Sequence, residues 1–500
     1  MSDGFLLALT QFTSWQVIVG LLAGVLVGYL VGALPGLSAS MGMALLIPFT
    51  FGLSPVVSIV MLVTLYMASE YSGATPAILC NTPGEPSAAI TALDGYPMRE
   101  QGRAGEALTL SILGSAFGSV ISTLMLIALA QSMAGFALAF GPADYFALAV
   151  LGLSLISALA GNSLLRGLIG LLIGLLVATI GIDPVDGTTR FVFHQGLLSG
   201  ISLVAALIGL FALSEVFEML ETSSSAPEPL QEVPDLAGQY ALLWPHRWVM
   251  VRSTVIGFII GVVPGAGATI ASVTAYVAEK RLSGDPDSFG KGNAAGVVAS
   301  ETANNACIPG ALAPMLALGI PGSGTAAILL GGLMVWGLNP GPLLFVEHKS
   351  FVWGTIASMY LGNVIGLVLV LSTVPIFASV LRVPFAAIAP MIVVSCAVGA
   401  YAVQNAMFDI WMMLGFGVLG YVLKKVGYPL APLTLALVLG SRTEDSFRLS
   451  MIGSGGDLGV FWSNWLVGSI TTLALVLLFW PALSSFMDRL RRSVGSPVNS

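Results

Sequence analysis

"GALPGLSAS" at residues 32–40 and "GVVPGAGAT" at residues 261–269 place the same Gly-x-x-Pro-Gly turn in two of the most apolar parts of the chain. Proline and glycine interrupt a helix, and inside a bilayer the freed backbone groups must be satisfied by protein or by a water-filled cavity. Two matching interruptions therefore predict a pair of broken helices that face the interior of the protein rather than lipid.

The composition of the chain is that of a membrane protein. Of its 500 residues, 56% are hydrophobic and 9% are charged, whereas soluble domains carry about 25% charged residues. Apolar runs of about 18–25 residues recur from Trp15 to Trp480, and each is long enough to cross a bilayer. We expect an all-α polytopic membrane protein, with helices that include 15–33, 41–68, 74–90, 266–280, 291–318 and 323–337.

Two further motifs recur in the same order as the Pro-Gly turns. "ASE" occurs at 68–70 and at 299–301, and "PGEPSAAI" at 83–90 matches "PGSGTAAI" at 321–328. Three matches in a fixed order predict an internal duplication. The polar stretch at 221–240, rich in Ser, Pro and acidic residues, has the composition of a linker.

The predicted organisation follows from these motifs. A first transmembrane repeat covers 1–221, an inter-repeat linker covers 222–247, and a second repeat covers 248–500. The basic tail "MDRLRRSVGSPVNS" favours a cytoplasmic C-terminus, and the N-terminus has no signal-peptide pattern and is expected to be uncleaved. Two repeats with broken or re-entrant helices place a substrate site at the centre, where the breaks meet.

Backbone N–H groups at the broken helix ends are the expected ligands of an anionic substrate. The helix dipole favours negative charge there, glycine allows a close approach, and neighbouring hydroxyls add neutral donors. Ordinary loop tips and helix caps are the structural alternative. The predicted substrate-binding residues are Pro35, Gly36, Ser38, Ser40, Thr82, Pro83, Gly84, Ser87, Pro264, Gly265, Gly267, Thr269, Pro321, Gly322, Ser323, Gly324 and Thr325.

A second group of residues is predicted to bind a coupling cation, Na⁺ or H⁺. Glu70 and Glu301 are matched acids in apolar surroundings, and a carboxylate in a membrane is a functional hypothesis by default. The amide oxygens of Asn81, Asn304 and Asn305 complete the set. The alternatives are acids at the headgroup level and interhelical hydrogen bonds, which contribute about 0.6–2 kcal/mol in membranes.

The remaining polar residues in apolar segments and loops are expected to have structural rather than ligand-binding roles. Arg166 lies in an apolar run, where snorkelling to the headgroups is favoured over contact with the substrate. Asp94, Asp183 and Asp186 are expected in turns, with contact to a partner subunit as the alternative for the Asp94 loop. The scattered cysteines and histidines predict no structural metal site, no other cofactor and no catalytic group.

The chain resembles the large membrane subunit of the tripartite tricarboxylate transporters, the TctA family. The residues that carry the resemblance include "GALPGLSASMGMALLIP" (32–48), "AILCNTPGEPSAAITALDGYPM" (77–98), "GIDPVDGTTRFVFHQGLLSGI" (181–201), "GVVPGAGATIASVTAYVAEK" (261–280) and "ETANNACIPGALAPMLALGIPGSGTAAILLGG" (301–332). The stretch "YMASEYSGATPAIL" (66–79), which contains Glu70, departs from the small residues expected there.

The resemblance implies a permease subunit in the bacterial inner membrane. Its expected partners are a small membrane subunit and a periplasmic binding protein that delivers an organic acid such as citrate, with uptake driven by a sodium or proton gradient. The alternative is an integral-membrane enzyme that acts on a lipid-linked substrate, but the sequence shows no Gly-x-Ser-x-Gly elbow or well-placed histidine. A channel is less consistent with the matched breaks, and no nucleotide-binding P-loop motif is present.

Overall fold

The computed structural model describes residues 10, 12–34, 36–159, 163–183, 186–221, 239–380 and 385–494. These residues form a helical protein in which the one sheet is a two-stranded hairpin, β1 (Gly181–Ile182) and β2 (Thr189–Arg190). Six helical segments within the described residues are long and apolar enough to cross a bilayer: Trp15–Ala33, Pro55–Cys80, Ala104–Ala137, Leu203–Glu221, Lys349–Thr373 and Met407–Lys425. This architecture is compatible with a multi-pass membrane protein.

Both Gly-x-x-Pro-Gly turns lie at the tips of helical hairpins. The first hairpin joins α2 (Trp15–Ala33) to α3 (Ala39–Leu46), and the second joins α11 (Arg247–Val262) to α12 (Gly267–Leu282). Glycines allow the first arm of each hairpin to pack directly on the backbone of a long helix. Gly24 and Gly28 of α2 face Met61 and Leu65 of α4 (Pro55–Cys80), and Gly257 and Gly261 of α11 face Ala303 and Cys307 of α13 (Ala294–Leu318).

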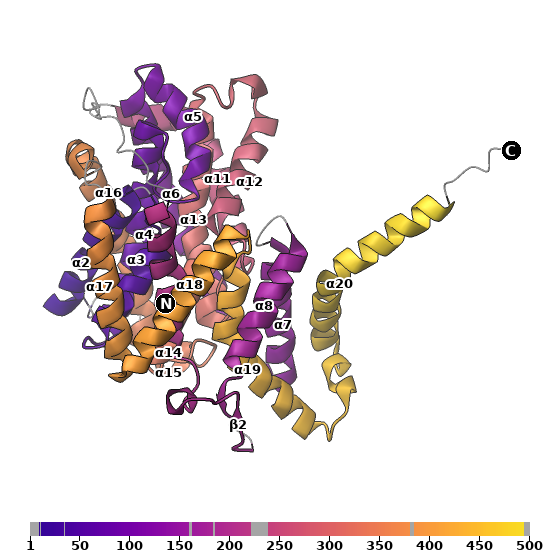
Figure 1. Cartoon of the computed structure of the whole chain (residues 1–500). Coiled ribbons are helices and arrows are strands. Elements are labelled where there is room, and N and C mark those ends of the chain that lie inside the picture. Colours follow the sequence, from indigo (N-terminus) through magenta and orange to yellow (C-terminus); the bar gives the residue numbers. More distant parts are fainter. Residues whose placement is uncertain are drawn as a thin grey trace.

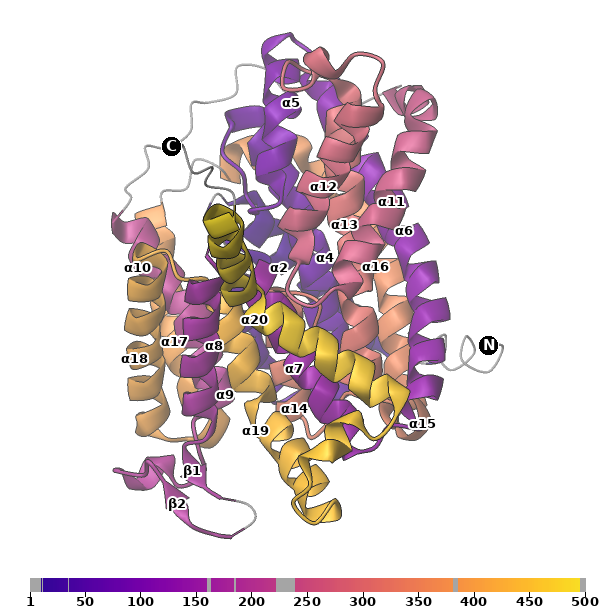
Figure 2. The ribbon, with the colours of Figure 1, turned by 90° about the vertical axis from the view of Figure 1, so that its right-hand side faces the viewer.

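Each long helix is followed by a connection that folds back onto its C-terminal part and leads into a shorter helix. After α4 the chain turns back, so that the Gly84 N–H donates to Gly73 O (3.1 Å), and α5 (Ala88–Glu100) begins. After α13 it turns back in the same way, the Gly322 N–H donates to Ala311 O (3.3 Å), and α14 (Gly324–Val335) begins. Figure 1 and Figure 2 show α5 at one end of the molecule and α14 at the opposite end, so these two units run in opposite directions.

The remaining helices surround these units. They are α6 (Ala104–Ala137), α7 (Pro142–Leu159), α8 (Leu164–Ala178), α9 (Leu203–Leu207), α10 (Ser214–Glu221), α15 (Leu344–Glu347), α16 (Lys349–Val380), α17 (Phe385–Gln404), α18 (Met407–Lys425), α19 (Leu430–Gly453) and α20 (Trp465–Val494). A π-helical turn at Ile208–Leu213 joins α9 to α10. Helix α20 first packs against α7, and its C-terminal part extends away from the body of the molecule (Figure 1).

The sequence predicts one helix over 41–68 and the next over 74–90, and the break between them was predicted at the wrong place. The structure ends the first segment with a 3₁₀ turn at Ile47–Thr50 and starts α4 at Pro55, so α4 runs without interruption through 69–73. The physical reason lies at the start of α4, where Ser54 caps the helix and Pro55 occupies its first turn. The predicted linker falls mainly on 222–238, which lie outside the described residues.

The expectation of a turn at Asp94 was also wrong. Asp94 lies inside α5, is fully buried, and binds the connection that precedes α13. Its Oδ1 accepts the N–H groups of Gly290 (2.8 Å), Lys291 (3.1 Å), Gly292 (2.9 Å) and Asn293 (2.8 Å), and its Oδ2 accepts the Tyr276 hydroxyl (2.8 Å). One carboxylate therefore joins α5 to the α12–α13 connection.

We expect Asp94→Asn to destabilise the folded protein without changing its substrate preference. The amide has half the acceptor oxygens and no charge, so several of these five donors lose a charge-assisted bond, each of which contributes about 1.5–3 kcal/mol. Thermal unfolding of the purified variant in detergent measures the effect. A melting temperature equal to that of the wild type would contradict this role.

Candidate functional site

The four helix N-termini that follow the breaks open onto one cavity of about 840 Å³. These are the first turns of α3, α5, α12 and α14. The wall contains, among the predicted substrate-binding residues, Ser38, Ser40, Ser87, Gly265, Gly267, Thr269, Ser323, Gly324 and Thr325. A cavity of this size is in the usual range for small-molecule sites.

The N-terminus of α12 presents the longest continuous segment of this wall, residues 265–270. Its N-cap, Ala266, provides no side-chain hydrogen bond, whereas Ser323 caps α14 by accepting the Ala326 N–H (3.1 Å). Gly265 and Gly267 have φ values of 79° and 67°, which only glycine adopts readily. The first-turn N–H groups of α12 thus lack a side-chain cap and face the cavity.

Hydroxyl groups connect the first part of the chain to the second across the cavity. Ser40 Oγ lies 2.8 Å from Thr325 Oγ1, which joins the first turns of α3 and α14. The Tyr66 hydroxyl of α4 lies 3.2 Å from Ser323 Oγ. These neutral donors and acceptors border the space that a ligand would occupy.

Two buried carboxylates also line the cavity, Glu70 of α4 and Glu85 of the α4–α5 connection. Glu70 accepts the Ser87 hydroxyl (2.8 Å). The Asn304 amide lies beside the Glu70 carboxylate but forms no hydrogen bond with it. Glu85 accepts the Ala39 N–H (2.6 Å) and the Ser69 hydroxyl, so it caps α3. Sequence reasoning missed Glu85, although its motif "PGEPSAAI" was one of the matched pair.

Basic side chains complete the wall. Arg166 at the start of α8 donates to Gly427 O (3.2 Å) and lies over the Tyr428 ring (5.8 Å). No carboxylate among the described residues forms an ion pair with Arg166, which is exposed at the start of α8. Lys424 of α18 also lines the cavity and forms ion pairs with Glu215 and Glu218 of α10.

Several predicted site residues lie behind the cavity wall instead of in it. Gly84 and Gly322 occupy equivalent positions, because a Cβ on Gly84 would overlap Gly32 O and a Cβ on Gly322 would overlap Gly261 O. Gly36 packs against Met219, and Pro35 lies outside the described residues. Thr82, Pro83, Pro264 and Pro321 also do not line the cavity.

We expect Gly84→Val and Gly322→Val each to abolish activity, since no side chain fits between the broken helix and the hairpin beneath it. The control is Gly415→Val on α18, because Gly415 is exposed, lies outside the cavity wall, and a Cβ on it meets no atom within 4 Å. Uptake by vesicles with equal amounts of membrane-inserted protein measures both. Wild-type uptake by either valine variant would contradict the close packing.

Among the predicted cation-binding residues, Asn304 lies beside Glu70, whereas Glu301, Asn305 and Asn81 lie away from the cavity wall. Glu301 is fully buried between α13, α5 and α6, where its carboxylate accepts Thr91 Oγ1 and Ser115 Oγ (3.2 Å). Asn305 donates to Ser115 Oγ (2.7 Å), and its Oδ1 has no partner. Asn81 is exposed at the end of α4 in the left-handed conformation. Glu70 is therefore the one member of this predicted set that lines the cavity.

Comparison with known proteins identifies the family. The model of the tripartite tricarboxylate transporter TctA family matches residues 18–435, which cover both hairpins and all four helix N-termini of the cavity. The chain belongs to the TctA family. The resemblance stated from the sequence motifs is thereby confirmed.

Two relatives that match this TctA protein come from Agrobacterium vitis. One, described as an uncharacterized 52.8 kDa protein in the TAR-I ttuC' 3' region, is 39% identical over 493 residues, which are 98% of this chain and 97% of the relative. Another, described as an uncharacterized protein in the TAR-II ttuC' 3' region, is 37% identical over 233 residues, 47% of this chain and 96% of the relative. No solved structure matches. Family membership points to a transporter component rather than to an enzyme.

Proposed function

We propose that this chain is the permease subunit of a tripartite secondary transporter and that it moves an organic carboxylate through the cavity between the four helix N-termini. The observation that carries the proposal is the convergence of these N-termini, with the uncapped first turn of α12 among them. Helix N-termini bind anions through their free N–H groups and dipoles. Arg166 adds a charge that no described carboxylate neutralises.

The two acids in the wall support coupling to a cation. Glu70 and Glu85 bring negative charge to the cavity that must accept an anion. Binding of Na⁺ between them, or their protonation, removes this repulsion and allows the substrate to enter. Cation and substrate would then bind together, which is the requirement for symport.

The arrangement of the matched units supports two inverted repeats and alternating access. The α2–α3 hairpin with α4 and α5 corresponds to the α11–α12 hairpin with α13 and α14, and these units run in opposite directions (Figure 2). Inverted repeats around a shared site are the usual basis of alternating access. A membrane enzyme is less well supported, because the cavity wall contains no histidine or cysteine that could act as base or nucleophile.

The family implies two partners, a small membrane subunit and a periplasmic binding protein, and we place the complex in the bacterial inner membrane. The test is uptake of labelled tricarboxylates, dicarboxylates and aromatic acids by cells that express this chain with its partner subunits, with and without sodium. We expect uptake of one class that requires every component and an ion gradient. An assembled complex that moves none of these acids would overturn the proposal.

We expect Glu301→Gln to abolish gradient-driven uptake or to remove its dependence on the cation. The Glu301 carboxylate is one of the few fully buried charges in the described helices, and the unpartnered Asn305 Oδ1 lies on the next turn of α13. Uptake measured against sodium concentration and external pH tests this. Sodium and pH profiles identical to those of the wild type would exclude Glu301 from coupling, and the same profiles for Glu70→Gln show which acid is responsible.

A further inference from the structure

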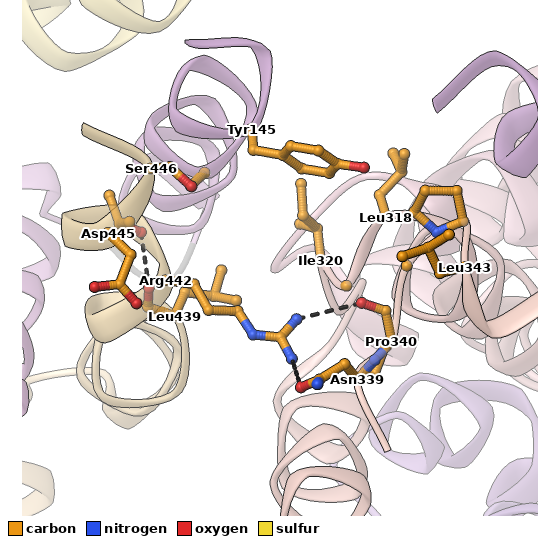
Figure 3. Close-up of a pocket in the computed structure, with 15 residues that line it drawn as sticks. Tyr145, Leu318, Ile320, Asn339, Pro340, Leu343, Leu439, Arg442, Asp445 and Ser446 are labelled. Carbon is orange, nitrogen blue, oxygen red and sulfur yellow. Dashed lines mark hydrogen bonds between the residues drawn. The ribbon is translucent and has the colours of Figure 1, made fainter. Parts of the chain in front are cut away.

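A second, smaller cavity lies at the end of the molecule that carries the β1–β2 hairpin. Its volume is about 300 Å³, and its walls come from α7, from the α13–α14 connection, from residues 339–343 and from α19. Figure 3 shows the Arg442 guanidinium extending from α19 toward Asn339 and Pro340, with the Tyr145 ring and Ile320 beside it. None of these residues lines the larger cavity between the four helix N-termini, which we call the central cavity.

Arg442 is held by neutral acceptors alone. Its Nη2 donates to Asn339 Oδ1 (2.8 Å) and its Nη1 donates to Pro340 O (3.2 Å). No carboxylate in the described part of the chain forms an ion pair with it, although Asp445 also lines the pocket. The nearby arginines differ, since Arg190 pairs with Glu444 and Arg448 pairs with both Asp183 and Glu444. A guanidinium with spare donors and no counterion suits a planar carboxylate.

The α13–α14 connection separates this pocket from the central cavity. Gly319 and Ile320 line the pocket, whereas Ser323 and Gly324 line the central cavity. Gly319 has a φ of 73°, and a Cβ there would lie 3.0 Å from Pro340 O and 3.1 Å from Arg442 Nη1. Arg442 and its acceptors therefore pack against one end of the segment whose other end forms the wall of the central cavity.

The two ends of the molecule differ in their number of basic residues, and this difference indicates how the chain is oriented in the membrane. The end formed by the α5–α6 turn and the α12–α13 connection, at the top of Figure 2, carries Arg99, Arg103, Lys280, Arg281 and Lys291. The hairpin end carries fewer, namely Arg190, Lys349, Arg442 and Arg448, and the start of α11 adds Arg247 and Arg252 to the opposite end. Basic residues favour the cytoplasmic side, which makes the hairpin end the outer face.

We propose that this pocket is an outer carboxylate-binding subsite of the transport path, in which Arg442 receives the anion before the 319–323 segment moves to admit it to the central cavity. The inference rests on the proposed function. The arriving carboxylate takes the guanidinium N–H groups from Asn339 and Pro340, which frees the connection that these bonds hold in place. Arg442 is thus both the first ligand of the anion and the residue that fixes the closed connection.

The test uses Asn339→Asp and Arg442→Gln in the complete transporter, with uptake measured from each face in right-side-out and inside-out vesicles. Asn339→Asp changes hardly any atom positions but supplies an internal carboxylate to Arg442. We expect both variants to raise the half-saturating substrate concentration at the outer face about tenfold or more and to leave the value at the inner face unchanged. Arg442→Lys should restore part of the affinity.

The outcomes separate the two proposals. If the wild-type complex moves no carboxylate, the proposed function fails. Suppose that the wild type transports and that Asn339→Asp has an unchanged half-saturating concentration at the outer face. The added ion pair then only strengthens the bonds that hold the 319–323 connection closed. Arg442 would have this structural role alone, and the subsite would be overturned. Equal changes at both faces would also overturn it, since they would place the effect in the central cavity.

Discussion

We expect Gly324→Leu to abolish carboxylate uptake while the protein inserts and folds as the wild type does. Gly324 begins α14 in the wall of the central cavity, and a Cβ built on it meets no atom within 4 Å. From this open position a leucine side chain would extend into the space that we assign to the substrate. Uptake by vesicles, normalised to the amount of inserted protein, measures the effect.

The matched control for this variant is Gly135→Leu. Gly135 lies on α6 outside the cavity, is exposed, and also has no atom within 4 Å of a built Cβ. We expect its uptake to equal that of the wild type. Full activity of Gly324→Leu would show that the substrate does not pass the N-terminus of α14.

We expect Arg166→Gln to raise the half-saturating substrate concentration by about 10–100-fold, because a hydrogen bond to a charged group contributes about 1.5–3 kcal/mol. The maximal rate should fall much less, since the guanidinium is not part of either hairpin. Arg166→Lys keeps the charge but loses the planar donor geometry, and should fall between the two. Initial rates over a range of substrate concentrations give both constants.

Arg281→Gln removes the same charge from an exposed position at the end of α12 and serves as the control. It separates contact with the substrate from a general change in surface potential. Equal shifts for Arg166→Gln and Arg281→Gln would contradict a direct role of Arg166 in the cavity.

The paired motifs indicated where the chain turns back, because breaks in apolar segments have few structural solutions. The Gly-x-x-Pro-Gly turns lie at hairpin tips, and residues after each break, such as Ser38 and Ser323, lie around one cavity. The all-α membrane architecture followed from composition and apolar run length alone. The direction of the two units was not predictable, because it depends on an exact count of crossings.

Contacts between segments that are distant in the chain could not be predicted from the sequence. From the sequence, Asp94 has the pattern of a turn residue, and only the packing of α5 against the α12–α13 connection gives it five hydrogen-bond donors. The contact of Arg166 with Gly427 and Tyr428 likewise depends on α8 lying beside residues 427–431. Glu85 belongs to a quoted motif, and a glutamate two residues before Ser87 at a break was a usable signal. Its role as the cap of α3 required the return of the chain onto α2.

The measurement that tests the central claim most directly is protection by substrate of a cysteine introduced at Thr269. Thr269 lies on the first turn of α12 in the cavity wall. Thr269→Cys would be made after replacing Cys80, Cys307 and Cys396, with Asp287→Cys on the exposed α12–α13 connection as the reference. We predict that transported carboxylates slow alkylation at position 269 and leave alkylation at position 287 unchanged. Equal alkylation at position 269 with and without a substrate that the Thr269→Cys variant still transports would contradict a site at the helix N-termini.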